Sequence, residues 1–179
     1  DAQALTRQYP DVTVIEDGSF IGVVAAREEY AVRAINAAAS LTQWDEGDPA
    51  PTNIVDALAA TGAPEEVVHE TGESSVDDAS LSVDVRRAYF AHASIAPSCA
   101  IATWTEDHLE VYSHTQGPHG LRDALGLVFG LEPLNDVTVI HRQGAGTYGH
   151  SGQDDVALDA ALLARAVPGS PVRVIWSRA

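Results

Sequence analysis

From residue 82 onward, short β-branched segments alternate with two segments of helical spacing. The β-type segments are SVDVRRAYF (82–90), SCAIATW (98–104), LEVYS (109–113), DVTVIH (136–141) and PVRVIWS (171–177), and the helical ones are LRDALGLVFG (121–130) and DDVALDAALLARAV (154–167). Strand and helix need different hydrophobic periods, so this order limits the chain to helices packed on a sheet. We therefore predict an α+β fold.

The N-terminal segment predicts a separate β-β-α unit. VTVIEDGSFIGVVAA places Asp17-Gly18 between two apolar runs, which is typical of a β-hairpin. A helix is predicted from Arg27 to about Leu41, with acidic residues in its first turn, and a short strand over 41–44 is expected to follow.

An acidic, proline-containing stretch, DEGDPAPT (45–52), is typical of a surface connector. Beyond it, NIVDALAAT predicts a short helix and EEVVHETG a short strand. We predict a β-β-α domain over 1–47, a linker with short elements over 48–81 and a second domain over 82–179.

The charge of the chain excludes one class of partner. The chain has 26 acidic residues and only 10 basic ones, all arginine, so the formal net charge is −16. A phosphate backbone would be repelled, so we expect no nucleic-acid partner. No apolar stretch approaches the roughly 20 residues of a membrane span, and the first residues show no signal pattern, so we expect the fragment to be soluble. The compartment is left open, with the cytoplasm favoured over the periplasm.

Cys99 is the only cysteine, so an internal disulfide is excluded. It lies in an apolar run, IAPSCAIATW, and we expect a small buried thiol there.

The loop GAGTYGHSG (144–152) matches the G-x-G-x-x-G fingerprint of dinucleotide sites. Three polar residues separate the preceding strand from Gly144, and Ala164 stands about where the ribose-binding acid is needed, so that function is rejected. A backbone that a ligand can approach closely, before a helix, is still predicted. Ser151 and Asp154 form a predicted capping box for this helix.

A second polar junction reads LEVYSHTQGPHGLRDALG, in which Gly117-Pro118 predicts a helix start. Two interpretations stay open: Ser113 or Thr115 caps that helix while Gln116 faces water, or the junction forms a ligand site with the glycine loop. The histidines lack the spacing of a metal site, and G-x-S-x-G is absent, so we expect neither a directly bound metal nor a serine hydrolase.

Three stretches, in this order and spacing, carry a family resemblance: HASIAPSCAIATW, EVYSHTQGPHGLRDALGLVFGL and VTVIHRQGAGTYGHSGQDDVALDAALLARAVPGSPVRVIWSR. They resemble the molybdopterin-binding large subunit of the xanthine dehydrogenase and aldehyde oxidase family, above all its isoquinoline 1-oxidoreductase and nicotinate hydroxylase types. The resemblance implies that 1–47 is the C-terminal part of a hammerhead-like domain and that 82–179 is the first part of the molybdopterin-binding domain.

The resemblance also implies roles for individual residues. Gln116 corresponds to a glutamine beside the molybdenum, and Gly146, Tyr148 and Gly149 correspond to a loop that passes over the cofactor. His114 replaces a serine of the family, and His150 follows the loop, so both are candidates for the substrate pocket. The glutamate base of the family lies beyond the last residue, so no catalytic residue is expected in this fragment.

The function implied is that of a molybdenum hydroxylase fragment, inactive alone, whose whole enzyme oxidatively hydroxylates N-heterocycles or aldehydes with water-derived oxygen. Its implied partners are the remainder of the large subunit and a small subunit or domain with iron–sulfur clusters. Molybdopterin is expected to be absent from the isolated fragment. The alternative is a cofactor-free α+β binding or assembly module, in which the glycine loop is only a tight connection.

Overall fold

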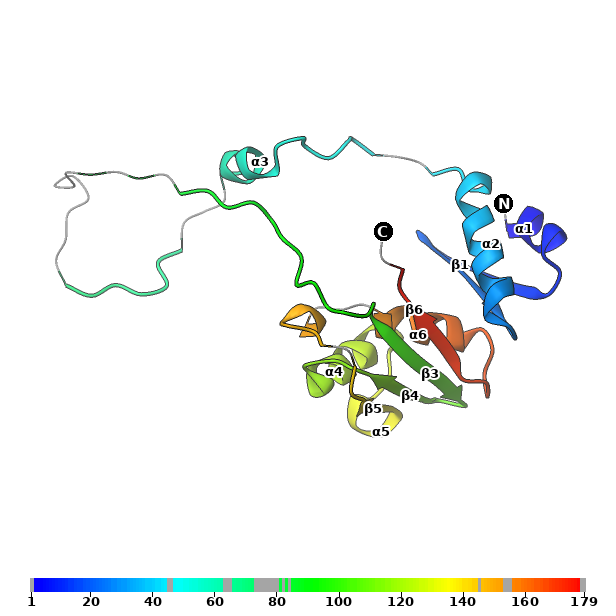
Figure 1. Cartoon of the computed structure of the whole chain (residues 1–179). Coiled ribbons are helices and arrows are strands. Elements are labelled where there is room, and N and C mark those ends of the chain that lie inside the picture. Colours follow the sequence, from blue (N-terminus) through cyan, green and yellow to red (C-terminus); the bar gives the residue numbers. More distant parts are fainter. Residues whose placement is uncertain are drawn as a thin grey trace. The chain divides into compact units, whose positions relative to one another are not determined.

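The computed structural model describes residues 2–44, 47–62, 66–72, 81, 83, 85–144, 146–152 and 156–177. The chain forms two compact units, one of Asp1–Gln43 with Ala91–Ala179 and one of Trp44–Phe90. The first unit holds a two-stranded and a four-stranded sheet with their helices (Figure 1). The predicted α+β class is confirmed.

The N-terminal part of the first unit is a hairpin followed by a helix. Its elements are α1 (Ala2–Gln8), β1 (Val12–Asp17), β2 (Phe20–Ala25) and α2 (Glu28–Leu41). Gly18 takes a φ of 59° in the tight turn, where Asp17 pairs with Phe20, so the hairpin prediction is confirmed. The strand predicted over 41–44 is wrong, because α2 includes Leu41 and the N–H of Thr42 donates to the carbonyl of Ala38.

The four-stranded sheet has the order β5-β4-β3-β6. Its strands are β3 (Cys99–Thr105), β4 (His108–Ser113), β5 (Val137–His141) and β6 (Val172–Ile175). β3 is antiparallel to β4 and β6, whereas β4 and β5 are parallel. A parallel pair needs a crossover, which α4 (Pro118–Phe129) and α5 (Pro133–Asp136) supply.

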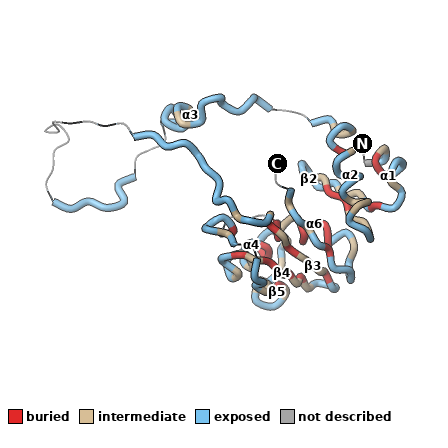
Figure 2. The backbone as a smooth tube through the Cα atoms, in the orientation of Figure 1, coloured by how far each residue is buried: buried red, intermediate tan, exposed pale blue. Residues whose placement is uncertain are grey.

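Helix α6 (Val156–Arg165) packs on this sheet through small side chains. Ala157, Ala160, Ala161 and Ala164 are almost completely buried, so the helix backbone approaches the strands closely. The indole N–H of Trp104 donates to the carbonyl of Ala161 at 2.9 Å, and its ring meets Phe129 edge-on. Figure 2 shows the buried residues concentrated in the sheet and the helix packed on it, which gives the loops at the sheet edge a rigid base.

The unit over 44–90 contains α3 (Ile54–Ala60), which confirms the predicted short helix. The described residues of 65–72 and 82–90 contain no strand, so both strand predictions fail there. Val83, Val85, Tyr89 and Phe90 are exposed. A segment of alternating apolar and polar side chains forms a strand only where a neighbouring strand accepts and donates hydrogen bonds. In the described part of the chain, no strand pairs with these residues.

None of the described helices combines the length and the hydropathy that a membrane crossing requires.

Candidate functional site

The carboxyl ends of β4 and β5 meet at one edge of the sheet. Ser113 pairs with His141 at the end of the parallel ladder, and the N–H of Arg142 donates to the carbonyl of Ser113 at 2.8 Å. The polar residues after β4 and the glycine loop after β5 therefore begin side by side. Ligand sites commonly form outside the carboxyl ends of parallel strands.

Ser151 ties these two segments together. Its carbonyl oxygen accepts hydrogen bonds from the N–H of Gln116 and from the hydroxyl of Thr115, both at 3.3 Å. Its own hydroxyl donates to the carbonyl of His114 at 3.4 Å, and the residue is only 2% exposed. One buried residue thus fixes three consecutive residues of the other junction.

This arrangement corrects the predicted capping box. Ser151 lies in a 3₁₀ helix over His150–Gly152, and α6 begins later, at Val156. Its hydroxyl bonds to the neighbouring junction instead of to the first turn of α6. Asp154, the other member of the predicted pair, lies outside the described residues.

At the start of α4 the N-cap position is Gly117, which has no side chain, so neither Ser113 nor Thr115 is the cap. The hydroxyl of Thr115 accepts from the N–H of Gly117 at 3.2 Å while it donates to Ser151. Gln116 is exposed. The junction therefore exposes the amide side chain of Gln116, while hydrogen bonds fix the backbone at Gln116 and at Gly117.

A cavity of about 420 Å³ lies between the two junctions. Its lining consists of His114, Thr115, Gln116, Pro118, His141, Gln143, Gly144, Gly146 and Thr147. Among these residues there is no carboxylate, although the chain carries a net charge of −16. The volume lies within the range of small-molecule sites. The described wall of the cavity has amide, hydroxyl and imidazole side chains but no carboxylate, which suits an anionic ligand.

Two glycines of the loop, Gly144 and Gly146, lie too close to their neighbours for a side chain to be added without a shift. A Cβ on Gly144 would lie 2.9 Å from the Cβ of His114, and one on Gly146 would lie 2.9 Å from the hydroxyl of Tyr148. Gly146 and Gly149 have φ angles of 89° and 99°, which favour glycine. The loop backbone therefore lies directly against the imidazole of His114.

The hydrogen bonds of two imidazoles fix their tautomers. His114 Nε2 accepts from the N–H of Cys99 at 3.3 Å, and His141 Nδ1 donates to the carbonyl of Thr115 at 3.0 Å. His114 Nδ1 is buried and has no hydrogen-bond partner among the described residues. Burial raises the pKa of the Cys99 thiol, and the positive charge of Arg173 partly opposes this shift.

Of the residues singled out in the sequence, Gln116, His114 and Gly146 line the same cavity. The ring of Tyr148 packs over Gly146, although most of the side chain is exposed. The backbone of Tyr148 has a positive φ angle of 53°. Gly149 and His150 follow outside the cavity lining.

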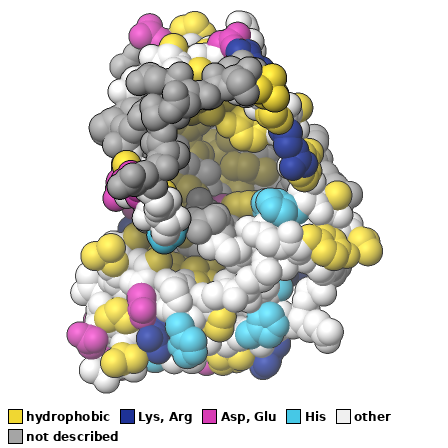
Figure 3. All heavy atoms as spheres, turned by 90° about the vertical axis from the view of Figure 1, so that its left-hand side faces the viewer, with side chains coloured by type: hydrophobic (Ala, Val, Ile, Leu, Met, Phe, Trp, Pro, Cys, Tyr) yellow, Lys and Arg dark blue, Asp and Glu magenta, His cyan; other side chains and the backbone are white. Residues whose placement is uncertain are grey.

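The His150 ring centroid lies 5.6 Å from that of His92. Figure 3 views the molecule from the left-hand side of Figure 1 and shows several histidine side chains, in cyan, on this face. Across the described part of the chain, no three His, Cys, Asp or Glu side chains are grouped as a metal site.

Thr115, Ser151 and His141 contribute to the site, but the sequence pointed to Thr115 and Ser151 only as helix caps and did not point to His141. His141 could have been found, because it ends a strand that the pattern predicts, next to the strand that leads to Gln116. Ser151 has no such signal, since its spacing to Asp154 is that of an ordinary helix cap.

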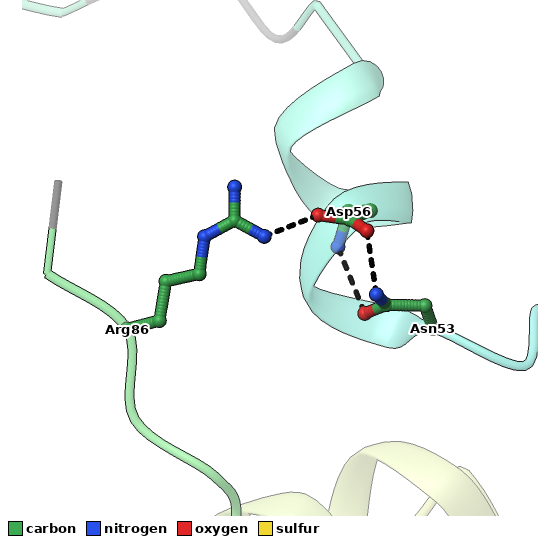
Figure 4. Close-up of polar contacts among 3 residues, drawn as sticks. All are labelled: Asn53, Asp56 and Arg86. Carbon is green, nitrogen blue, oxygen red and sulfur yellow. Dashed lines mark hydrogen bonds and ion pairs between the residues drawn. The ribbon is translucent and has the colours of Figure 1, made fainter.

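A second polar cluster, in the unit over 44–90, has a structural role. Asn53 accepts from the N–H of Asp56 at the start of α3, and Arg86 forms an ion pair with Asp56 (Figure 4). All three are accounted for by the cap and the ion pair, so this cluster offers no ligand site.

Residues 49–179 match the family model of the molybdopterin cofactor-binding domain. A nicotinate dehydrogenase subunit from Pseudomonas putida is 37% identical over 172 residues. This alignment covers 93% of the present chain but 14% of the relative, so the chain spans about a seventh of the length of that curated relative.

The fold is also found in a solved structure. Quinoline 2-oxidoreductase from Pseudomonas putida 86 superimposes with a TM-score of 0.61 and 24% sequence identity. The match covers 91% of the present chain and 23% of that protein. Both parts of the first unit therefore occur together in a larger protein of known fold.

Proposed function

The chain belongs to the molybdopterin cofactor-binding domain family, and from this premise we propose that it forms part of the large subunit of a molybdenum hydroxylase. The whole enzyme would oxidatively hydroxylate N-heterocycles or aldehydes with oxygen derived from water. The present chain would contribute one wall of the cofactor site and be inactive alone. In domain terms, 1–47 would end a hammerhead-like domain, 48–81 would be a linker and 82–179 would begin the molybdopterin-binding domain.

One observation carries this proposal: Gln116 and the glycine loop line a single cavity that contains no carboxylate among its described walls. The fit to an anionic, oxygen-rich group has two further supports. The loop can pack this closely against His114 and Tyr148 because Gly144 and Gly146 carry no Cβ, and its bare backbone would also let an added group come close. His114 Nδ1 also lacks a partner among the described residues, so it is free to donate to an added acceptor.

When bound, molybdopterin supplies the redox-active metal that accepts electrons and activates the water-derived oxygen. Gln116 would orient the group, since its neutral amide can donate to an oxygen ligand and its backbone is fixed by Ser151. The backbone around Gly146, Tyr148 and Gly149 would hold the other side of the cofactor.

His114 and His150 are proposed for the substrate side of the site. At His114, Nε2 already accepts from the Cys99 N–H, so the side it turns to the site offers a donor only, whereas the exposed imidazole of His150 would meet the ring nitrogen or carbonyl oxygen of the substrate. His150 lies beside His92 and outside the described cavity lining, so we place it at the entrance to the site.

The proposed partners are the remainder of the large subunit and a subunit or domain with iron–sulfur clusters, which would carry electrons away. This inference is supported by the relative whose alignment covers 93% of the chain, since that protein is one subunit of a dehydrogenase and extends far beyond the matched region.

The test is a combined metal and pterin analysis of the full-length protein after maturation, followed by assays with N-heteroaromatic compounds and with aldehydes. We expect molybdenum and pterin in the purified protein and turnover of at least one substrate class. A fully matured protein with neither metal nor turnover would favour the cofactor-free binding or assembly module instead.

A further inference from the structure

The tautomer of His114 follows from its contact with Cys99. A backbone N–H can only donate, so His114 Nε2, which lies 3.3 Å from the Cys99 nitrogen, must be the acceptor. An imidazole that accepts at Nε2 carries its hydrogen at Nδ1. His114 therefore offers an N–H donor on the other side of its ring.

Within the described residues this donor is unsatisfied. Nδ1 of His114 is buried, and no atom of the described residues accepts its hydrogen. Buried polar groups in folded proteins nearly always have a partner, so an orphaned one needs an explanation. Cys99 already holds the ring from Nε2, which opposes a simple reversal of the two nitrogens.

The position of the ring connects this donor to the candidate site. His114 stands two residues before Gln116 and lines the same cavity. Gly144 lies so close that an added Cβ would be 2.9 Å from the His114 Cβ. The carbonyl of His114 is held by the hydroxyl of Ser151, so its backbone is fixed as well. A missing acceptor is therefore expected to arrive with the group that enters this cavity.

We propose that the Nδ1–H of His114 donates to an oxygen or sulfur atom of the bound molybdopterin group, which makes His114 a positioning residue for that group. The proposal rests on the proposed function and adds a specific contact to it. The Cys99 N–H fixes the tautomer, the Gly144 backbone bounds the ring, and the donor is satisfied only when the site is filled.

Two substitutions separate this role from a merely structural one. His114→Gln can place a carbonyl oxygen near the position of Nε2, so it keeps an acceptor for Cys99 but offers no donor at the Nδ1 position. His114→Asn places its amide near the position of Nδ1, so it keeps the donor but loses the contact with Cys99. Each variant would be made in the full-length, matured protein.

Two readouts are taken for each variant: the molybdenum and pterin content per protein, and the midpoint of thermal unfolding. We expect His114→Gln to unfold near the wild-type temperature but to retain roughly ten-fold less cofactor after dialysis, as is usual when an orienting contact is lost. We expect His114→Asn to retain its cofactor but to unfold at a lower temperature.

The proposal is overturned if both folded variants retain cofactor equally, if both lose it, or if the Asn variant loses it and the Gln variant keeps it. Should His114→Gln fail to fold, the Asn variant decides alone, since loss of cofactor from folded His114→Asn contradicts the proposal. If the wild-type protein holds no molybdenum, the proposed function fails first, and the two failures are thereby distinguished.

Discussion

The backbone N–H of Gln116 donates to the carbonyl oxygen of Ser151 at 3.3 Å, which joins two loops that follow different strands. The same oxygen accepts from the hydroxyl of Thr115. Gln116 is itself exposed, so its placement at the cavity depends on this shared acceptor. The geometry of the candidate site is therefore a property of both loops together.

Substitution of Thr115 should weaken this junction. Thr115→Val preserves the volume of a side chain that is 6% exposed, but it removes the donor to Ser151 and the acceptor for the N–H of Gly117. We expect the free energy of unfolding to fall by about 1–3 kcal/mol, measured by urea denaturation. Thr105→Val, at an exposed position at the end of β3, is the control and should change it by less than about 0.5 kcal/mol. Equal effects of the two substitutions would contradict the role given to Thr115.

Alanine at two glycines should act in opposite directions. Gly144→Ala brings a Cβ to 2.9 Å from the Cβ of His114, an atom that cannot move without the backbone, and should destabilise by about 1–3 kcal/mol. Gly120→Ala lies in α4 with no heavy atom within 4 Å of the added Cβ, so it should stabilise by up to about 1 kcal/mol. Chemical denaturation of both variants checks the pair, and a neutral Gly144→Ala would show that the loop is looser than described.

The strands over 98–177 could be predicted because each has β-branched residues and a neighbour to pair with. SVDVRRAYF (82–90) has the same pattern, yet its described residues form no strand. The pattern describes side chains only, whereas a strand also needs hydrogen bonds from a second segment. Sequence reasoning therefore found the sheet but also predicted strands over 41–44, 65–72 and 82–90, which the described residues there do not form.

Gln116 and the glycines of the loop could be selected from the sequence, since polar residues and glycines cluster after predicted strands. Their connection through Ser151 could not, because Ser151 and Asp154 have the spacing of a helix cap. A long-range contact with His114 uses the Ser151 hydroxyl instead. The spacing of neighbouring residues cannot show whether the Ser151 hydroxyl bonds to the next helix or to a residue that is distant in the sequence.

The Cys99 thiol should titrate at a higher pH than an ordinary cysteine, because burial raises its pKa. Cys99 is the only cysteine, so the pH dependence of alkylation by iodoacetamide reports on it alone. In urea the midpoint should return to the ordinary value. The folded state holds the proton more tightly, so stability should fall as the pH rises from the unfolded pKa to the folded one.

Arg173 supplies a control for the cysteine titration. Its positive charge favours the thiolate and lowers the Cys99 pKa, so Arg173→Gln should move the alkylation midpoint to a still higher pH. Arg173 also forms an ion pair with Glu28, but both side chains are largely exposed, so little stability should be lost. A midpoint that moves to lower pH would show that this arginine does not act on the thiol.

Gln116 is the residue for which folding and function should separate most clearly. Because its side chain is exposed and the contact with Ser151 uses its backbone, Gln116→Ala should change the free energy of unfolding by less than about 0.5 kcal/mol. If its amide orients the bound group, turnover of the full-length, matured enzyme should fall roughly 10–100-fold while the protein stays folded.

The matched control for Gln116→Ala is His119→Ala, an exposed position in the first turn of α4 that does not line the cavity. It should leave turnover and stability unchanged. Steady-state rates, molybdenum content and urea denaturation of both variants decide the matter. Unchanged turnover in Gln116→Ala would show that the amide has no role in the site. Lost turnover together with lost stability would mean that the side chain supports the junction instead of the bound group.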